Sequence, residues 1–363
     1  MIPGPLNFRY YMTIRTIFDL TLKNLEHGYY KLTRQRHRII PYKIVAELTT
    51  QCNSKCLYCD IWKIKKEDLK KVDLVDFGSF LKKMNGHLLW MAFSGGEVTT
   101  NNQFPEIIDL IRKNCPKLRI VTFTTNGLAP QRILDFALLI KKELDCDTFV
   151  TISLDGDEET HDRVRGIKGN YAKCMETYQL LKHHGVPVHF GITVADGNYS
   201  FIHQSFKSYS DRIKAVTFFH TGGIFLTDPD ADRAADLKIL DSLKTIYKHY
   251  RVSALGDWLI KIHIKIAILF LQKERKTNII PCDVGLSSAH LMANGDLLPC
   301  MYLPPIRKIS EGFELSDYHS PEAEAMLAAI KRDNCPHCWM ACYSPHNMLQ
   351  SPVKSLSALL KPI

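Results

Sequence analysis

At 363 residues, with 45% hydrophobic and 23% charged residues, the chain has the composition of an ordinary soluble protein, and its length fits one large domain with an appendage. Residues 1–20 contain polar and basic residues where a signal peptide needs an unbroken apolar region, and no later run approaches the roughly 18 apolar residues of a membrane-spanning helix. We therefore expect a cytoplasmic protein, whose net charge of +9 points to an anionic or amphipathic partner.

The N-terminal segment, residues 1–39, is basic and has the pattern of an amphipathic helix. From Arg9 to Lys43 there are eight Lys or Arg residues against two acids. Such a helix could lie on an anionic membrane surface, but we expect it to bury its apolar stripe across the bottom or side of its own domain. The stripe consists of residues at helical spacing, namely Ile14, Ile17, Phe18, Leu22 and Leu25.

Six apolar, β-rich runs follow, with amphipathic helical patterns between them. This alternation predicts parallel strands joined by crossover helices, in either a doubly wound sheet or an incomplete barrel. In both folds ligands bind at the carboxyl ends of the strands. The predicted strands are residues 43–50, 88–95, 119–126, 148–155, 187–194 and 215–222, and the clearest helical patterns are residues 104–114, 131–144 and 171–185.

Three cysteines, Cys52, Cys56 and Cys59, follow the end of the first predicted strand. A structural zinc site takes four protein ligands, and no fourth cysteine occurs before Cys115. A cubane iron–sulfur cluster can instead be held by three thiolates, which leaves one iron free for an external ligand. The spacing therefore favours an iron–sulfur cluster that binds a cofactor.

The pattern Cys-x3-Cys-x2-Cys, with Tyr58 just before the last cysteine, resembles the radical S-adenosylmethionine (SAM) enzymes. The resemblance implies that Cys52, Cys56 and Cys59 hold a [4Fe–4S] cluster whose open iron chelates the amino and carboxylate groups of SAM. An electron from a donor such as flavodoxin or ferredoxin would then split the sulfonium and give a 5′-deoxyadenosyl radical. A chance match in a non-catalytic zinc-binding protein is the alternative.

Motifs at later strand ends extend the resemblance. Gly95-Gly96-Glu97 is similar to the family's GGE motif, in which the glycines let the backbone approach a ligand and Glu97 offers a carboxylate to an ammonium. Paired glycines also suit a plain turn. By the same resemblance Ser153 reaches the ribose hydroxyls and Arg165 the cofactor carboxylate. The other cofactor contacts that the resemblance implies are Tyr58, Asn126, Thr193 and Val194.

The last third of the chain carries a second cysteine group. Asn294-Gly295-Asp296 is a hairpin signal between two short apolar runs, and such a hairpin would bring Cys282 and Cys300 to one edge. The pattern resembles the auxiliary-cluster domains of the SPASM and Twitch subgroups, and five cysteines suit a single auxiliary [4Fe–4S] cluster of the Twitch kind. A zinc ribbon is the alternative. The candidate ligands are Cys282, Cys300, Cys335 and Cys338, and Cys342 could replace one of them.

The predicted fold class is α/β, with a partial (β/α)6 TIM-like barrel and a C-terminal cysteine-rich, Twitch/SPASM-like domain. The core barrel is expected at residues 40–225, a helical linker at 226–277 and the auxiliary-cluster domain at 278–363. Within the linker, the run at 258–276 is apolar and basic. Part of this run alternates like a strand and the rest has helical spacing, so its class stays open.

The predicted activity is reductive cleavage of SAM, followed by hydrogen abstraction from an unidentified small-molecule, lipid-like or peptide substrate, with net oxidation through the auxiliary cluster. A peptide- or protein-modifying maturase is the alternative, although only 42 residues precede the first strand, fewer than a leader-binding module has in family terms. Nucleic acid ranks last because no RNA-binding motif is visible. The catalytic base is unassigned, and Asp155 and His220 at strand ends are expected to be structural.

Overall fold

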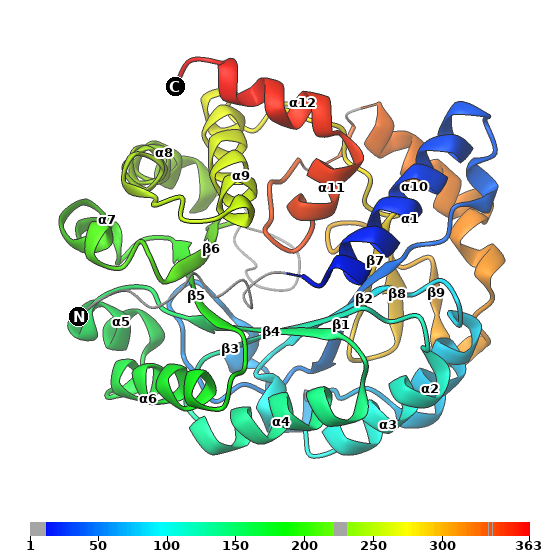
Figure 1. Ribbon diagram of the computed structural model, residues 1–363, viewed down its shortest axis with the longest axis horizontal. Coiled ribbons are helices and arrows are strands. Elements are labelled where there is room, and N and C mark those ends of the chain that lie inside the picture. Colours follow the sequence, from blue (N-terminus) through cyan, green and yellow to red (C-terminus); the bar gives the residue numbers. More distant parts are fainter. Residues whose placement is uncertain (1–11, 221–230, 333, 336) are drawn as a thin grey trace.

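The computed structural model describes residues 12–220, 231–332, 334–335 and 337–363. In this part of the chain nine strands form one sheet, in the order β6-β5-β4-β3-β2-β1-β7-β8-β9. Neighbouring strands from β1 to β6 are all parallel, and helices surround them (Figure 1). The six strands are β1 (Lys43–Thr49), β2 (Trp90–Gly95), β3 (Ile120–Thr125), β4 (Asp147–Ser153), β5 (Val188–Val194) and β6 (Ile213–Phe218).

These strands confirm the predicted α/β fold with a partial barrel of six parallel strands. The end of the last predicted strand, residues 221–222, lies outside the described residues. The predicted helices at 104–114, 131–144 and 171–185 are found as α3, α4 and α6. The helices that follow the first five strands are α2 (Leu74–Lys83), α3 (Phe104–Asn114), α4 (Pro130–Glu143), α5 (Glu158–Arg165), α6 (Asn170–His183) and α7 (Tyr199–Ser205).

Aromatic packing joins the helices to the sheet. The rings of Phe104 on α3 and Phe136 on α4 are stacked with centroids 3.8 Å apart, and Phe93 of β2 meets Phe104 edge-on at 5.6 Å. All three side chains are buried. Burial of such large rings is a main source of stability, and it fixes the ends of the strands from which the site is built.

The C-terminal third adds strands to the same sheet. β7 (Ser288–Leu291) pairs parallel with β1, and β8 (Asp296–Leu298) pairs antiparallel with β7. The expected hairpin is therefore present, and Gly295 supplies its left-handed backbone with φ of +89°. The remaining C-terminal elements are β9 (Arg307–Lys308), α10 (Pro321–Lys331), α11 (Ser344–Gln350) and α12 (Pro352–Ser357).

Helix α1 (Ile14–Leu32) lies across the starts of the strands. Its Leu20 packs in a cluster with Tyr42, Trp90 and Ile120. The expectation that the stripe from Ile14 to Leu25 is buried on the domain is wrong, because these apolar residues are exposed and the opposite face is buried. The helix is held on the domain by a few polar contacts and by Leu20. The spacing of apolar residues in the sequence does not reveal such contacts. Arg9 lies outside the described residues.

The linker contains two helices, α8 (Ala231–His249) and α9 (Leu255–Gln272), and α9 packs against α8 and β6. The run at 258–276 is thus helical up to Gln272. Its strand-like alternation arises because α9 is buried nearly all round, including Lys265 and His263 at 3% and 6% exposure. Among the described residues no helix combines the length and apolarity needed to span a membrane.

Candidate functional site

The three thiols of the first cysteine group lie on the loop that leaves β1. The backbone of this loop is fixed to the end of α5, because Lys55 N donates to Arg165 O at 3.0 Å and Leu57 N donates to Val164 O at 3.0 Å. Gly166 is needed here, since its φ is +66° and a Cβ atom would lie 2.6 Å from Lys55 O. The loop and the end of α5 therefore form one rigid corner.

The thiols are partly buried and influence one another. Burial, with a smaller contribution from the neighbouring thiols, raises the pKa of Cys52 to about 12 and that of Cys59 to about 11. Nη1 of Arg165 donates to Sγ of Cys56 at 3.5 Å. A buried thiol of this kind ionises readily only beside positive charge, which metal ions supply. Three such thiols beside one guanidinium are a suitable donor set for an iron–sulfur cluster.

Asp155 and Arg165 form a buried ion pair next to this loop. Nε of Arg165 lies 2.7 Å from Oδ2 of Asp155, and Oη of Tyr58 donates to the same oxygen at 2.6 Å. Thr193 N donates to the other carboxylate oxygen at 3.0 Å. Burial alone would lower the pKa of Arg165, but the negative charge of Asp155 outweighs it and holds the pKa above its usual value. Three of the predicted cofactor contacts therefore meet at Asp155, which sequence reasoning had treated as structural.

Glu97 is buried at the start of the turn after β2. Its Oε1 accepts hydrogen bonds from Oγ1 of Thr99 and Oγ1 of Thr125, both at 2.7 Å, and its Oε2 accepts one from Asn126 N at 2.8 Å. Burial raises the pKa of Glu97, and these hydrogen bonds oppose the rise. The carboxylate is thus held rigidly at the carboxyl end of the sheet.

The two glycines before Glu97 serve a contact within the chain. A Cβ on Gly95 would lie 2.3 Å from Thr49 O, and a Cβ on Gly96 would lie 2.1 Å from Gln51 O. The backbone that approaches the glycines is that of the last residue of β1 and of the first cysteine loop. Glycine is required because any side chain would push the β2 turn away from that loop.

The remaining predicted contacts lie at the ends of β3, β4 and β5. The side-chain Nδ2 of Asn126 donates to Oδ1 of Asn53 at 2.7 Å, and Asn53 lies inside the first cysteine loop. Ser153 ends β4 and is half-buried, and its carbonyl accepts a hydrogen bond from Cys174 Sγ at 3.6 Å. The side chain of Val194 is fully buried in the core, so only its backbone faces the end of the strand.

The second cysteine group gathers beside β7. The pKa of the Cys338 thiol is raised by burial and then by the thiols of Cys282, Cys300 and Cys335. Burial also raises the pKa of Cys282 to about 12 and that of Cys300 to about 11. Cys342 is exposed and stands apart from these four, with Lys43 as the charge that acts on its thiol. The structure thus brings four of the five thiols into mutual electrostatic range.

Lys43 of β1 explains the different surroundings of Cys342. Its ammonium donates to Cys342 O at 2.5 Å and lies 3.9 Å from the centre of the Trp90 ring. Burial lowers the pKa of Lys43 to about 8. A buried ammonium needs such partners, so the turn that carries Cys342 is tied to the start of β1.

A buried polar chain between the two cysteine groups was missed by the sequence analysis. Nε2 of His290 on β7 lies 3.0 Å from Oε1 of Glu47 on β1, and its Nδ1 lies 3.0 Å from Oη of Tyr343. Glu47 and His290 are 1% and 3% exposed. The available signal was a carboxylate in the middle of an apolar strand, which demands a buried partner.

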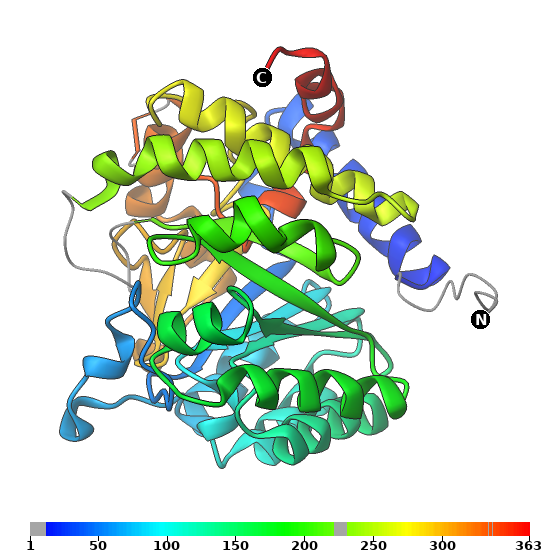
Figure 2. The ribbon, with the colours of Figure 1, turned by 90° about the vertical axis from the view of Figure 1, so that its left-hand side faces the viewer.

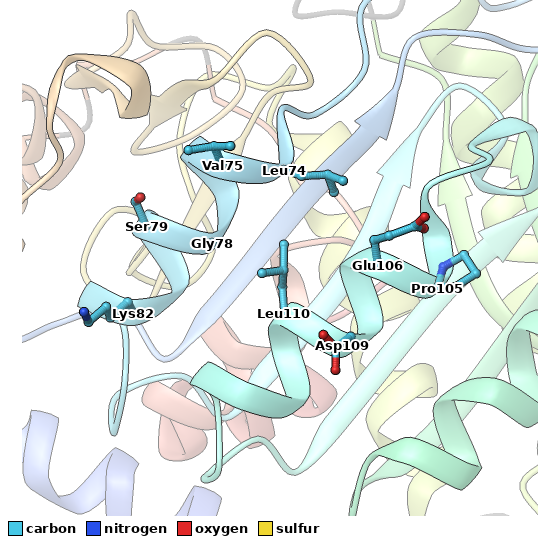
Figure 3. A pocket seen from close by; sticks show the side chains of 9 residues that line it. All are labelled: Leu74, Val75, Gly78, Ser79, Lys82, Pro105, Glu106, Asp109 and Leu110. Carbon is cyan, nitrogen blue, oxygen red and sulfur yellow. The ribbon is translucent and has the colours of Figure 1, made fainter.

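Two cavities lie away from the first cysteine group. A groove of about 730 Å³ runs between α2 and α3 on the outside of the barrel, where Gly78 allows Leu110 to approach closely (Figure 3). A second cavity of about 490 Å³ lies at the end of α1 and reaches Cys282.

Within the described residues, no three His, Cys, Asp or Glu side chains are placed to hold a single metal ion as they stand.

His220, at the end of β6, is buried against Arg275. Its Nδ1 lies 3.3 Å from Nη1 of Arg275, which in turn forms an ion pair with Asp236. Burial and, to a smaller extent, the charge of Arg275 lower the pKa of His220 to about 3. This neutral, enclosed imidazole fits the structural role expected for it.

A family model described as "Radical SAM superfamily" matches residues 46–201. The chain is 27% identical over 311 residues to "Antilisterial bacteriocin subtilosin biosynthesis protein AlbA" of Bacillus subtilis (strain 168), a match that covers 82% of this chain and 64% of that protein. It is 29% identical over 188 residues to Fe-coproporphyrin III synthase of Methanosarcina barkeri, with 49% and 43% covered. The chain therefore spans less than two thirds of the length of both relatives.

The solved structure described as "Native anSMEcpe with bound AdoMet" superposes with a TM-score of 0.60 at 16% identity, covering 88% of this chain and 97% of that one. This likeness shows the shared barrel fold. Residues 46–201 therefore resemble a radical SAM domain, and the strand order and the first cysteine loop fit this resemblance. Proteins of this superfamily bind a [4Fe–4S] cluster together with SAM.

Proposed function

We propose that the protein is a radical SAM enzyme that cleaves SAM reductively and abstracts hydrogen from an organic substrate, with net oxidation. The observation that carries this proposal is the position of Cys52, Cys56 and Cys59 at the carboxyl end of β1, within the radical SAM domain and next to Glu97 and Arg165. These three thiols would hold the first cluster, with electrons from a donor such as flavodoxin or ferredoxin.

The side chains around the loop would bind and orient SAM. Glu97, held by Thr99, Thr125 and Asn126, offers a fixed carboxylate for the cofactor's ammonium. Arg165 is the cation for the cofactor's carboxylate, and its pairing with Asp155 keeps it in place before SAM arrives. The further contacts are proposed as Tyr58, Gly95, Gly96, Asn126, Ser153, Thr193 and Val194.

We assign the auxiliary [4Fe–4S] cluster to Cys282, Cys300, Cys335 and Cys338, because these thiols lie within electrostatic range of one another. Cys342 is then the spare cysteine, set apart by its contact with Lys43. We propose on this basis that the C-terminal region is of the SPASM/Twitch kind. When bound, the first cluster with SAM supplies the 5′-deoxyadenosyl radical, and the auxiliary cluster supplies an acceptor for the electron left on the substrate.

A peptide or protein substrate is the second candidate. The relative that matches over 82% of the chain is named for the biosynthesis of a bacteriocin, which favours a peptide. The relative that matches over 49% is a synthase of Fe-coproporphyrin III, which favours a small molecule instead. Because the two relatives differ in substrate, we propose the radical chemistry for this chain and treat the peptide as a distinct outcome to be tested.

The experiment is anaerobic reconstitution with iron and sulfide, followed by measurement of iron content and of 5′-deoxyadenosine formed from SAM with a reductant. We expect wild-type protein to hold two clusters and form 5′-deoxyadenosine. Cys52→Ala should lose the first cluster and this product, whereas Cys338→Ala should lose only the auxiliary cluster. The matched control Cys146→Ala removes a cysteine outside both groups and should change neither.

A Cys52→Ala protein that still forms 5′-deoxyadenosine would contradict the site. A wild-type protein that takes up zinc and forms no iron chromophore would make the chain a zinc-binding protein. The substrate class is tested separately, by finding which deuterated candidate transfers its label to 5′-deoxyadenosine. Label transfer from a peptide would establish the second candidate.

A further inference from the structure

Helix α1 carries a broad apolar face that is largely exposed in the described structure. Figures 1 and 2 show the helix on the outside of the molecule, with its long axis along the surface. Seven large side chains spaced as one helical face are about half exposed or more. They are Ile14 (87% exposed), Ile17 (52%), Phe18 (59%), Leu22 (49%), Leu25 (65%), Tyr29 (57%) and Leu32 (86%).

The opposite face fixes α1 so that it cannot roll and bury this stripe. Nε of Arg119 lies 2.6 Å from Oδ2 of Asp19, and Nζ of Lys31 lies 2.7 Å from Oδ1 of Asp283. Leu20 and His27 are buried beneath the helix. A partner from outside is therefore needed to cover the apolar face, and monomeric proteins rarely leave so large a patch uncovered.

The charges around this face are positive. The acids of α1 are neutralised, Asp19 by Arg119 and Glu26 by Lys23. The turn after the helix carries Arg34, Arg36 and Arg38. Among the described residues, none of these three arginines forms an ion pair with a carboxylate. A partner that fits must therefore be apolar at its core and negative at its rim.

The cavity of about 490 Å³ at the C-terminal end of α1 has the same character. Lys31, Arg36, Lys331 and Lys354 contribute four cationic side chains to its lining, against the single carboxylate of Asp283. Its floor is apolar, formed in part by isoleucine and leucine side chains from the loop before β7 and from α10. The cationic side chains of this cavity suit the phosphate headgroup of a lipid, and the apolar face of the neighbouring helix suits its acyl chain.

We propose that the exposed face of α1, together with this cavity, docks the protein on an anionic phospholipid bilayer. A second copy of the chain is disfavoured, since each copy carries a net charge of +9 and would bring its own arginines against the other's. Because no described helix can span a membrane, the contact is peripheral. The exposed face of α1 lies away from the first cysteine loop, whereas the cavity reaches Cys282, which we assign to the auxiliary cluster.

The test is co-sedimentation of the reconstituted full chain with vesicles of phosphatidylcholine containing phosphatidylglycerol, compared with pure phosphatidylcholine. We expect binding only to the anionic vesicles. Phe18→Ser with Leu25→Ser should weaken it at least about tenfold, as should Arg34→Glu with Arg38→Glu. Because all four side chains are exposed, the thermal midpoint and SAM cleavage in solution should not change.

Matched controls test whether vesicle binding depends on this surface or only on exposed apolar area and net charge anywhere on the protein. Val75→Ser with Leu237→Ser removes two apolar side chains that are 77% and 79% exposed elsewhere, and Lys65→Glu with Lys66→Glu makes the same change in net charge. Both should bind vesicles as the wild type does. Equal loss in the control variants would overturn the proposal.

Three other results would also overturn it. Equal binding to pure phosphatidylcholine would remove the role of charge. A dimer in sedimentation that Phe18→Ser with Leu25→Ser dissociates would make a second copy the occupant. A chain lacking residues 1–11 that bound vesicles at least about tenfold better would make that segment the occupant.

Discussion

Gly96 illustrates how single residues hold the first cysteine loop in place. Its N–H donates to Thr49 O at 2.7 Å, and the next N–H, of Glu97, donates to Gln51 O at 2.8 Å. With no Cβ, the turn after β2 lies directly against the loop that carries Cys52. The glycine pair therefore acts on the ligand site through the backbone of the chain itself.

Replacing Gly96 with alanine should displace this loop. The new Cβ would lie 2.1 Å from Gln51 O, a contact that backbone must move to relieve, and we expect a loss of about 1–3 kcal/mol in the free energy of unfolding. Iron bound at the first site and 5′-deoxyadenosine formation should fall together. Iron analysis and urea unfolding measure the two effects.

Gly28→Ala is the matched control, because no atom lies within 4 Å of the position its Cβ would take and alanine favours a helix. It should keep wild-type iron content and raise the free energy of unfolding by up to about 1 kcal/mol. If Gly96→Ala assembled its first cluster as fully as Gly28→Ala does, the close backbone contact would have no bearing on the site.

The β7–β8 hairpin is the element that positions the second cysteine group. Gly295 turns the chain at φ of +89°, and Asp296 N donates to Oδ1 of Asn294 at 3.1 Å. Met301 and Tyr343 pack with Cys282 and Cys300 on the neighbouring face. The turn therefore determines where both thiols lie relative to β1.

Gly295→Val should damage the second site and spare the first. A β-branched residue at this φ costs about 1–3 kcal/mol, whereas a Cβ itself has room, since its nearest neighbour would be 3.4 Å away. We expect iron to fall from two clusters to one, with 5′-deoxyadenosine still formed. Gly295→Asn is the control, because asparagine tolerates the left-handed region. Equal iron loss in both variants would mean that backbone conformation is not the cause.

The sequence predicted the elements whose signals are local. The six barrel strands were found because buried parallel strands are continuous apolar runs, and the hairpin because Asn294-Gly295-Asp296 is a turn sequence. The parallel pairing of β7 with β1 was not predicted, since it joins residues about 245 positions apart that carry no shared pattern. The exposed face of α1 was misjudged because periodicity defines an apolar face without saying what covers it.

The site was predicted to a similar degree. The cysteines and the Gly95-Gly96-Glu97 motif could be recognised from their spacing, but the contacts among side chains could not. Asp155 received a structural role because one carboxylate at a strand end has no distinguishing signal, and its ties to Tyr58, Arg165 and Thr193 appear only in three dimensions. Such contacts depend on rotamers and on loop positions that no sequence pattern encodes.

Across the whole molecule, buried neutral histidines should make the protein sensitive to acid. Burial lowers the pKa of each of these side chains, which remain neutral in the folded protein at pH values where the unfolded chain takes up protons. Stability is thus present above about pH 6.5 and is lost as the pH falls toward the folded pKa values. The histidines are His27 and His220, with pKa about 3, His161, His189 and His263, with pKa about 4, and His346, with pKa well below its usual value.

We expect the free energy of unfolding to decrease steadily from about pH 6.5 to pH 5, and His161 alone to account for up to about 2 kcal/mol of the decrease. Its Nδ1 accepts a hydrogen bond from Asp155 N at 3.1 Å, which requires the neutral ring. Glu97 opposes the trend, because burial raises its pKa. Urea unfolding at several pH values measures the slope.

His161→Asn retains an acceptor for Asp155 N but cannot take up a proton, so its stability should depend less steeply on pH. His183→Asn, at an exposed position, is the control and should follow the wild type. Parallel curves for His161→Asn and wild type would show that this histidine does not contribute to acid lability.

The strand that leads into the first cysteine loop is hydrogen-bonded along both of its edges, to β2 on one side and to β7 on the other. A shortened protein that stopped before β7 would leave one row of β1 amides and carbonyls bare, together with the carboxylate of Glu47. Such an edge invites pairing between molecules and precipitation. The C-terminal third of the chain thus covers an edge of β1 that would otherwise be open, so a shortened protein should keep β7 to stay in solution.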